Sequence, residues 1–211
     1  MYLAVGTALH SEDLQPYQVY RCLYNNELSR SWVRPLEMFH ERLESKELRF
    51  TPIARVRVMV PEDEREVLAF GYEAWGGGQT LEEFIEHYAT DRNHLRGTGY
   101  VLERMDGTRV AGLNTLRFAR HRVGLARLAT SRHYRGQGFG SLLMQAVMEI
   151  LRSEDPEVRC LLFSEISPLF YEKLGFRALP EGQQRFLPAV AMISGDDATQ
   201  RIDDTITSSY F

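Results

Sequence analysis

Three glycines at alternate positions follow an arginine in the stretch 132–141, RHYRGQGFGS. Glycine adopts backbone dihedrals that side chains forbid, so Gly136, Gly138 and Gly140 can turn successive N–H groups into one concavity. The apolar helical pattern that begins directly afterwards adds the unpaired N–H groups and the positive dipole end of a helix. Arg135 contributes a positive charge. The stretch therefore predicts a binding site for a phosphate or a pyrophosphate.

Two common phosphate-binding loops do not match this stretch. A P-loop requires a lysine followed by serine or threonine after its last glycine, and Ser141 and Leu142 stand there. A Rossmann fingerprint requires glycine or alanine at position 141 or 143, depending on the glycine that starts the count, and serine and leucine stand there. Another kind of anion-binding loop, or a glycine-rich turn with no ligand, remains open.

The elements that must position this loop follow from hydrophobic periodicity and turn signals. Pro61 followed by acidic residues predicts a helix start, and Thr80 with Glu83 predicts a capping box. Asp106 and Gly107 predict a hairpin turn. In order, we expect a strand at 53–60, helices at 61–74 and 81–89, a strand pair within 99–119, a strand at 123–131, a helix at 141–152, a strand at 157–164, a short helix at 167–174 that Gly175 closes, and a strand at 184–193.

The residues before and after this region have a different composition. The run 18–24, QVYRCLY, is rich in β-branched and aromatic residues and predicts a strand. We therefore expect a small β-rich domain at 1–52, a larger α/β domain at 53–193 and a polar C-terminal tail at 194–211.

Composition and charge narrow the classes of partner. The chain has 211 residues, 44% of them hydrophobic and 26% charged, as in ordinary globular proteins. A net charge of -4 argues against nucleic acid as the partner. The two cysteines have no CxxC spacing, and no segment approaches the roughly 18 apolar residues of a membrane span. We expect a cytoplasmic protein that binds neither nucleic acid, membrane nor metal.

The run RLATSRHYRGQGFGSLLMQAVMEIL resembles the acyl-CoA-binding motif of the GCN5-related N-acetyltransferases (GNAT), Arg/Gln-x-x-Gly-x-Gly/Ala, through Arg135, Gly138 and Gly140. FYEKLGF at 170–176 resembles the second signature of this family, and the order of the predicted elements is the family's order. The resemblance covers about residues 53–193. It implies an α/β (α+β) GNAT fold, with a mixed central sheet flanked by helices whose fourth and fifth strands run parallel and splay apart.

The resemblance also implies a cosubstrate, acetyl-CoA, and the residues that hold it. The pyrophosphate would lie on the backbone N–H groups of residues 135–141, and the pantetheine arm would run beside the preceding strand. A backbone N–H at Ala129 or Thr130 would face the thioester oxygen. Ser164 stands where the family often has an asparagine that contacts the cofactor. The implied cofactor-binding residues are Leu128, Ala129, Thr130, Arg135, Gly136, Gln137, Gly138, Phe139, Gly140, Ser141 and Ser164.

The family reaction is direct attack of an amine on the acetyl thioester. A lysine-like amine with a pKa of about 10.4 is only about one part in 2,500 free base at pH 7, a penalty of about 4.6 kcal/mol, so a base or proton relay is useful. Many members place a glutamate on the central strand, where this chain has Arg127. The remaining candidates are Glu165 and Glu103, and His121 or His133 acting through water.

Two candidates for catalysis follow from this comparison. Tyr171 matches the tyrosine that protonates the departing thiolate in many members, and its alternative role is that of a core aromatic. Glu165 is a candidate base, and its alternative role is an acid that stabilises the start of the following helix.

The N-terminal segment carries a second resemblance. ALHSED, VYRCLY, WVRPLEMF and LRF are similar to a small bacterial domain of unknown function, DUF1653, but without its usual opening segment, so the unit would borrow a strand or start upstream.

Two functions stay open. One is N-acetylation of a primary amine of a small molecule or protein; the other is an acyl-CoA-binding sensor or scaffold without turnover. The acidic segment GGGQTLEEFIEHY suits a cationic amine. The resemblance leaves a homodimer open.

Overall fold

The computed structural model describes residues 2–22, 27–29 and 31–195, and the chain divides into two compact units, Met1–Ile53 and Ala54–Phe211. Most of the tail expected at 194–211 lies outside the described residues, and Ser194 itself belongs to a strand.

The N-terminal unit contains a three-stranded antiparallel sheet in the order β1-β2-β3, formed by Tyr2–Leu9, Pro16–Cys22 and Ser31–Pro35. A four-residue helix, α1, covers Leu36–Phe39. The strand expected at 18–24 corresponds to β2, and residues 23 and 24 lie outside the described residues. The unit does not borrow a strand, because residues 2–9 supply its first one.

Aromatic side chains form the small core of this unit. Tyr20 is 6% exposed, and Tyr2 packs edge-on against it with ring centroids 5.3 Å apart. Phe39 and Phe50 stack at 4.4 Å beside Tyr20. Such aromatic contacts bury much apolar area in few residues, which suits a unit with little other core.

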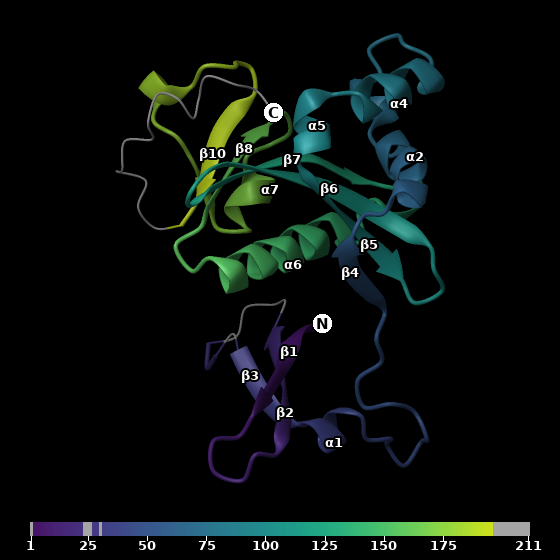
Figure 1. Cartoon of the computed structure of the whole chain (residues 1–211), viewed down its shortest axis with the longest axis vertical. Coiled ribbons are helices and arrows are strands. Elements are labelled where there is room, and N and C mark those ends of the chain that lie inside the picture. Colours follow the sequence, from purple (N-terminus) through teal and green to yellow (C-terminus); the bar gives the residue numbers. More distant parts are fainter. Residues whose placement is uncertain (1, 23–26, 30, 196–211) are drawn as a thin grey trace. The chain divides into compact units, whose positions relative to one another are not determined.

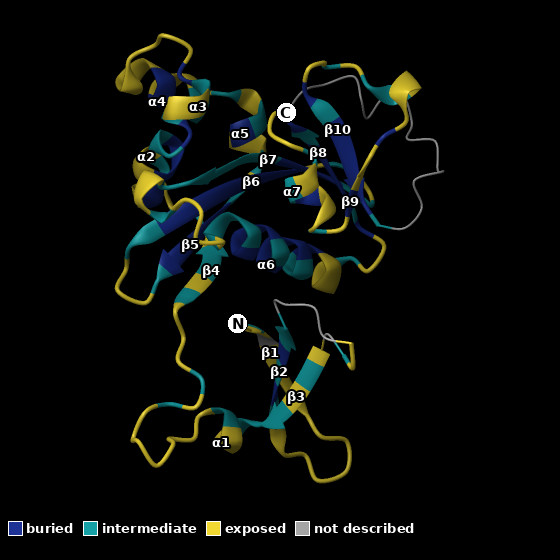
Figure 2. Cartoon of the chain, turned by 180° about the vertical axis from the view of Figure 1, so that it is seen from behind, coloured by how far each residue is buried: buried dark blue, intermediate teal, exposed yellow. Residues whose placement is uncertain are grey.

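The second unit is a seven-stranded mixed sheet between two layers of helices. Its strand order is β4-β5-β6-β7-β8-β10-β9. Figures 1 and 2 show α6 on one face of the sheet and α2, α4 and α5 over the other. The strands are β4 (Ala54–Val58), β5 (Thr98–Arg104), β6 (Arg109–Ala119), β7 (Arg122–Thr130), β8 (Arg159–Ser164), β9 (Phe176–Ala178) and β10 (Val190–Ser194). The α-helices are α2 (Pro61–Ala69), α3 (Tyr72–Trp75), α4 (Leu81–Ala89), α5 (Arg92–Arg96), α6 (Phe139–Glu154) and α7 (Leu169–Glu172).

Helix α6 buries one face against the sheet, as its periodicity predicts. Leu143 and Val147 are completely buried, as are Val101 and Val110 on neighbouring strands, and Figure 2 shows this layer in the colour of buried residues. The capping box of α4 forms, because the Thr80 side chain accepts from the Glu83 N–H and the Glu83 carboxylate accepts from the Thr80 N–H at 2.8 Å.

Three local features differ from the sequence expectation. The helix expected at 61–74 is two helices, α2 and α3. Gly71 lies between them, where a larger residue would not fit because a Cβ would lie 2.3 Å from the Trp75 ring. Helix α5 and strand β9 are additional. The last strand begins at Val190, not at Gln184, whose side chain accepts from the Ala191 N–H at 2.8 Å.

The predicted parallel strands and their splay are confirmed. Strands β7 and β8 pair in parallel at three positions only, Arg122 with Arg159, Val123 with Cys160 and Gly124 with Leu161. A β-bulge lies further along β7, where the register with β6 shifts between Gly112 and Asn114 and Arg127 has φ +55°. Bulges bend a strand and increase its twist, so this bulge helps to carry β7 away from β8.

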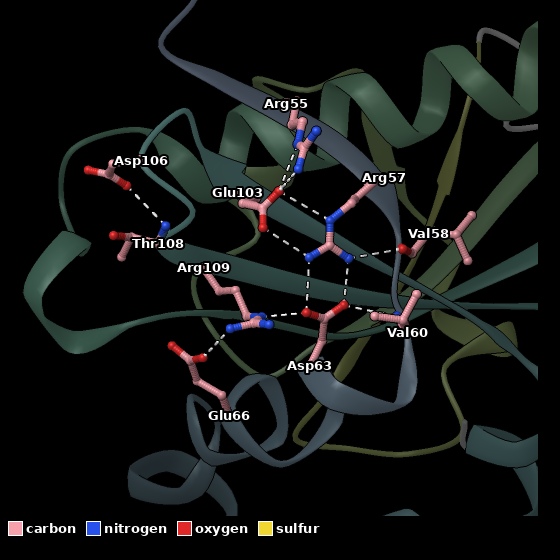
Figure 3. Close-up of polar contacts among 10 residues, drawn as sticks. All are labelled: Arg55, Arg57, Val58, Val60, Asp63, Glu66, Glu103, Asp106, Thr108 and Arg109. Carbon is pink, nitrogen blue, oxygen red and sulfur yellow. Dashed lines mark hydrogen bonds and ion pairs between the residues drawn. The ribbon is translucent and has the colours of Figure 1, made fainter.

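A network of ion pairs fixes α2 to strands β4, β5 and β6 of the sheet (Figure 3). Asp63 of α2 is completely buried and accepts from Arg57 of β4 at 2.5 Å and from Arg109 of β6. Glu103 of β5 accepts from Arg57 and from Arg55 at 2.7 Å. Each buried carboxylate thus has two arginine partners, which buried charges require.

Candidate functional site

A pocket of about 1110 Å³ opens where β7 and β8 separate. Its walls include Leu125–Thr130 of β7, Leu162 and Phe163 of β8, and side chains from α3, α4 and α7. All of its lining residues lie between Phe70 and Tyr171, so the pocket belongs to the second unit alone. This volume lies slightly above the usual range of small-molecule sites, about 300–1,000 Å³, and suits a long ligand.

Eleven of the thirteen residues expected from the sequence line this pocket, and Gln137 and Ser164 do not. The Gln137 side chain donates to the His133 carbonyl at 3.0 Å. The Ser164 hydroxyl donates to the Ile166 carbonyl at 2.8 Å. Both side chains therefore hold the ends of loops beside the pocket. The residues that line it are Leu128, Ala129, Thr130, Arg135, Gly136, Gly138, Phe139, Gly140, Ser141, Glu165 and Tyr171.

The glycine loop forms one end of the pocket. Gly136 and Gly138 have φ values of +75° and +84°, which only glycine adopts without strain, and α6 begins directly after Gly138. A Cβ at either glycine would meet no heavy atom of the described residues within 4 Å, so the backbone borders open space. Left-handed glycines at a helix N-terminus are a suitable cradle for an anion.

Arg135 lies at the edge of this loop and is held by α3. Its Nη1 is 2.6 Å from Glu73 Oε2, its Nε donates to the Thr130 carbonyl at 3.1 Å, and its Nη2 donates to the Phe70 carbonyl at 3.3 Å. The hydrogen bond from Arg135 lowers the pKa of Glu73, so this carboxylate is charged at neutral pH. These contacts therefore fix the orientation of Arg135, and its charge is already paired with the Glu73 carboxylate.

Tyr171 lies on α7 and lines the pocket near Glu165. Its side chain is 9% exposed, and burial, with a smaller contribution from the Glu165 charge, raises its pKa to about 12. The phenol therefore stays protonated throughout the physiological range and can donate a proton.

Glu165 follows β8 and also lines the pocket. Its Oε2 accepts from the indole Nε1 of Trp75 on α3 at 2.7 Å. This hydrogen bond fixes the carboxylate across the pocket and places a negative charge near Tyr171.

Arg127 occupies the bulge of β7, where the family resemblance led us to look for a base. Its Nη2 donates to Asp91 at 2.7 Å, and its guanidinium lies 4.4 Å from the centroid of the Tyr88 ring. The ion pair and the cation–π contact hold a residue whose left-handed backbone costs about 1–2 kcal/mol. An arginine held in this way orients neighbouring groups and does not accept protons.

Three further candidates from the sequence lie outside the pocket lining. Glu103 belongs to the network in Figure 3, where hydrogen bonds from Arg57 and Arg55 lower its pKa to about 2. His121 pairs with Asp155 at 2.9 Å. The third is His133.

The structure adds residues to the site that sequence patterns did not single out. Trp75, His87, Tyr88, Asp91 and Asn93 line the pocket beside Glu165. The sequence contained a signal for one of these residues, because aspartate is a preferred N-cap of helices. The Asp91 carboxylate accepts from two backbone N–H groups at the start of α5. The position of Trp75 opposite Glu165 depends on long-range packing and has no local signature.

Comparison with family models decides what kind of site this is. Residues 95–178 match the model described as acetyltransferase (GNAT) domain. The chain carries a GNAT acetyltransferase domain. The match includes β7, the glycine loop and α7, so most of the residues that line the pocket lie within it. Residues 1–52 match the model of a family of unknown function, DUF1653.

Solved structures show the same fold. A GNAT family N-acetyltransferase from Escherichia coli in complex with CoA is 20% identical, with a TM-score of 0.54 and coverage of 71% of this chain and 86% of that chain. The PaiA N-acetyltransferase from Thermoplasma acidophilum, in complex with coenzyme A, is 16% identical, with a TM-score of 0.53 and coverage of 67% and 98%. At these identities the likeness establishes the fold. No curated protein matches the chain significantly.

The described residues include no helix that is long and apolar enough to cross a membrane. They also contain no group of three or more His, Cys, Asp or Glu side chains that could hold a metal ion.

Proposed function

We propose that this chain transfers an acetyl group from acetyl-CoA to a primary amine of a small molecule or protein, by direct attack within a ternary complex. The observation that carries the proposal is one continuous pocket whose lining includes both the anion cradle and the residues Tyr171 and Glu165. An anionic carrier with a reactive thioester at its far end fits this arrangement.

The residues along the pocket suit the parts of acetyl-CoA. The pyrophosphate would lie on the N–H groups between Arg135 and Ser141. The pantetheine would run along Leu128, Ala129 and Thr130, because β8 pairs with β7 only as far as Gly124 and leaves that edge open among the described strands. Backbone groups that lack a strand partner can bond an extended ligand arm.

The chemistry requires two proton movements around the attack. The ammonium loses one proton, its nitrogen then bonds the carbonyl carbon, and the carbon–sulfur bond breaks as the nitrogen loses a second proton. Tyr171 gives a proton to the departing thiolate and regains one from the nitrogen or solvent. One proton is released overall. Glu165 contributes a negative charge that draws the ammonium towards the thioester.

Charge at the acceptor end supports a cationic amine. Glu165 and Asp91 line this part of the pocket, and Asp91 is already paired with Arg127. Together with Arg127, these two carboxylates carry one net negative charge, which attracts an ammonium ion, and Trp75 and Tyr88 add aromatic walls.

The test is turnover of acetyl-CoA with a panel of primary amines, which includes polyamines, amino acids and lysine-containing peptides. We expect amine-dependent release of free thiol, with at least one cationic amine among the good acceptors, and a mass increase of the acceptor by one acetyl group. Tight binding of acetyl-CoA with no turnover on any amine would favour the sensor or scaffold function instead.

A further inference from the structure

A second, small cavity adjoins the large pocket at the bulge of β7. Its volume is about 20 Å³, and a single water requires about 10–15 Å³. Trp75, Tyr88, Arg127 and Ala129 line both the cavity and the large pocket. The cavity therefore borders the position proposed for the thioester, beside Ala129.

Three buried polar atoms from three different elements belong to residues that line this cavity. They are His94 Nδ1 on α5, Asn114 Oδ1 on β6 and Arg127 Nη1 on β7, and none has a hydrogen-bond partner within the described part of the chain. Each buried polar atom without a partner costs about 1–3 kcal/mol. Three such atoms, on residues that line one water-sized cavity, point to a shared partner.

The Glu64 carboxylate fixes the proton on His94. His94 Nε2 lies 2.6 Å from Glu64 Oε1, and a carboxylate only accepts, so in the neutral ring Nε2 carries the hydrogen and Nδ1 has the lone pair. The three cavity atoms then offer two acceptors, on His94 and Asn114, and one donor, on Arg127. A water molecule that donates twice and accepts once satisfies all three.

We propose that a water molecule in this cavity, together with His94 and Glu64, takes the first proton from the acceptor amine. This inference rests on the proposed acetyl transfer. The ammonium gives its proton to the water oxygen, the same water gives one of its own protons to His94 Nδ1, and the water is unchanged. The freed amine then attacks the thioester, and the imidazolium shares its other proton with Glu64.

The charged groups around His94 suit this relay. Glu64 of α2 stabilises the imidazolium, and its side chain is 34% exposed, so the proton can pass to solvent. Asp91 accepts from the His94 backbone N–H at 2.9 Å and from Arg127, which orders both residues beside the cavity. Arg127 of β7 and Tyr88 of α4 complete the wall of the cavity.

The first test compares three variants with an acceptor found in the amine panel. His94→Gln should lower kcat at least tenfold and change the KM for acetyl-CoA less than twofold, because general base help is typically about 10²- to 10⁴-fold. Glu64→Gln keeps the size of the side chain and should lower kcat severalfold. The matched control is His121→Gln, which breaks the His121–Asp155 pair outside the pocket and should leave kcat unchanged.

An acceptor amine of low basicity distinguishes a proton relay through His94 from a structural role of that residue. A matched acceptor whose amine is made weakly basic by fluorine on the neighbouring carbon is mostly deprotonated at neutral pH. The kcat of His94→Gln should therefore fall at least tenfold with the basic acceptor and hardly change with the fluorinated one. An equal loss with both acceptors would show that His94 is structural. Full kcat in His94→Gln together with lost kcat in Glu165→Gln would assign the proton to Glu165.

The water site has a readout that does not depend on turnover. A high-resolution crystal structure of the full chain should show a water within hydrogen-bond distance of His94 Nδ1, Asn114 Oδ1 and Arg127 Nη1. A dry cavity, or a His94 ring turned so that Nδ1 bonds protein, would overturn the inference even if acetyl transfer is confirmed. If no amine is acetylated, the proposed function fails and the relay fails with it, whereas the water site alone can still be confirmed.

Discussion

At the residue scale, the site combines groups whose protonation states are set by their surroundings. Burial keeps the Tyr171 phenol protonated, with a pKa of about 12, while the hydrogen bond from Arg135 keeps Glu73 charged. The proton donor and the Arg135–Glu73 pair thus line one pocket. Such a pocket suits a reaction in which the leaving group, and not the anionic carrier, needs a proton.

Tyr171→Phe removes the hydroxyl and keeps the ring and its packing against Phe170 and Phe176. We expect kcat to fall at least tenfold with acetyl-CoA affinity nearly unchanged, because general acid help is about 10²- to 10⁴-fold and a thiolate of pKa about 8.5 can leave unaided. Steady-state kinetics and calorimetry measure both quantities. Tyr100→Phe, at a buried tyrosine outside the pocket, is the control and should keep full activity. Full turnover in Tyr171→Phe would make that residue a packing aromatic.

At the element scale, the ion-pair network in Figure 3 fixes α2, which carries Glu64, against β4, β5 and β6. Local patterns predicted the capping box of α4 and the hairpin at Gly107, because each depends on neighbouring residues. They could not predict the network, whose partners are separated by up to 48 positions in the sequence. For the same reason the sequence left Glu103 open as a candidate base, whereas two arginines pair with its carboxylate.

Asp63→Asn should destabilise the chain by about 3 kcal/mol, because removal of one charge from a buried ion pair leaves its arginines without a counter-ion. Thermal or urea unfolding measures the change. Asp106→Asn is the control, since Asp106 is exposed and lies 3.6 Å from Arg104, and it should cost less than about 0.5 kcal/mol. Equal stability of the two variants would contradict the structural role of the network.

The same network predicts loss of stability in acid. Its hydrogen bonds from arginine lower the pKa of Asp63 and bring that of Glu103 to about 2, below their unfolded values of roughly 4. Such groups stabilise the fold above their unfolded pKa, and this stability is lost as the pH falls from about 4 towards 2. The loss should be smaller in Asp63→Asn.

At the scale of the whole molecule, the chain joins a DUF1653 match to a GNAT domain, and the fold of the second could be predicted well from the sequence. The glycine loop and FYEKLGF are local signals for backbone shape, so they led to the correct fold, and eleven of the thirteen expected residues line the pocket. The acceptor end could not be predicted, because Trp75, Asp91 and Arg127 come together only through the packing of α3, α4 and α5 against the sheet. The separate folding and the role of residues 1–52 stay predictions.

The central claim is that the pocket holds the pyrophosphate of acetyl-CoA on the glycine loop, and calorimetric titration of coenzyme A into the full chain tests it most directly. Gly138→Val adds a side chain to the open side of the loop at a φ of +84°. Gly107→Val makes the same change at a φ of +87° in the hairpin turn outside the pocket, so it matches the backbone strain. We predict that the wild type and Gly107→Val bind with equal affinity and that Gly138→Val shows no measurable binding. Unchanged affinity in Gly138→Val would contradict this placement of the cosubstrate.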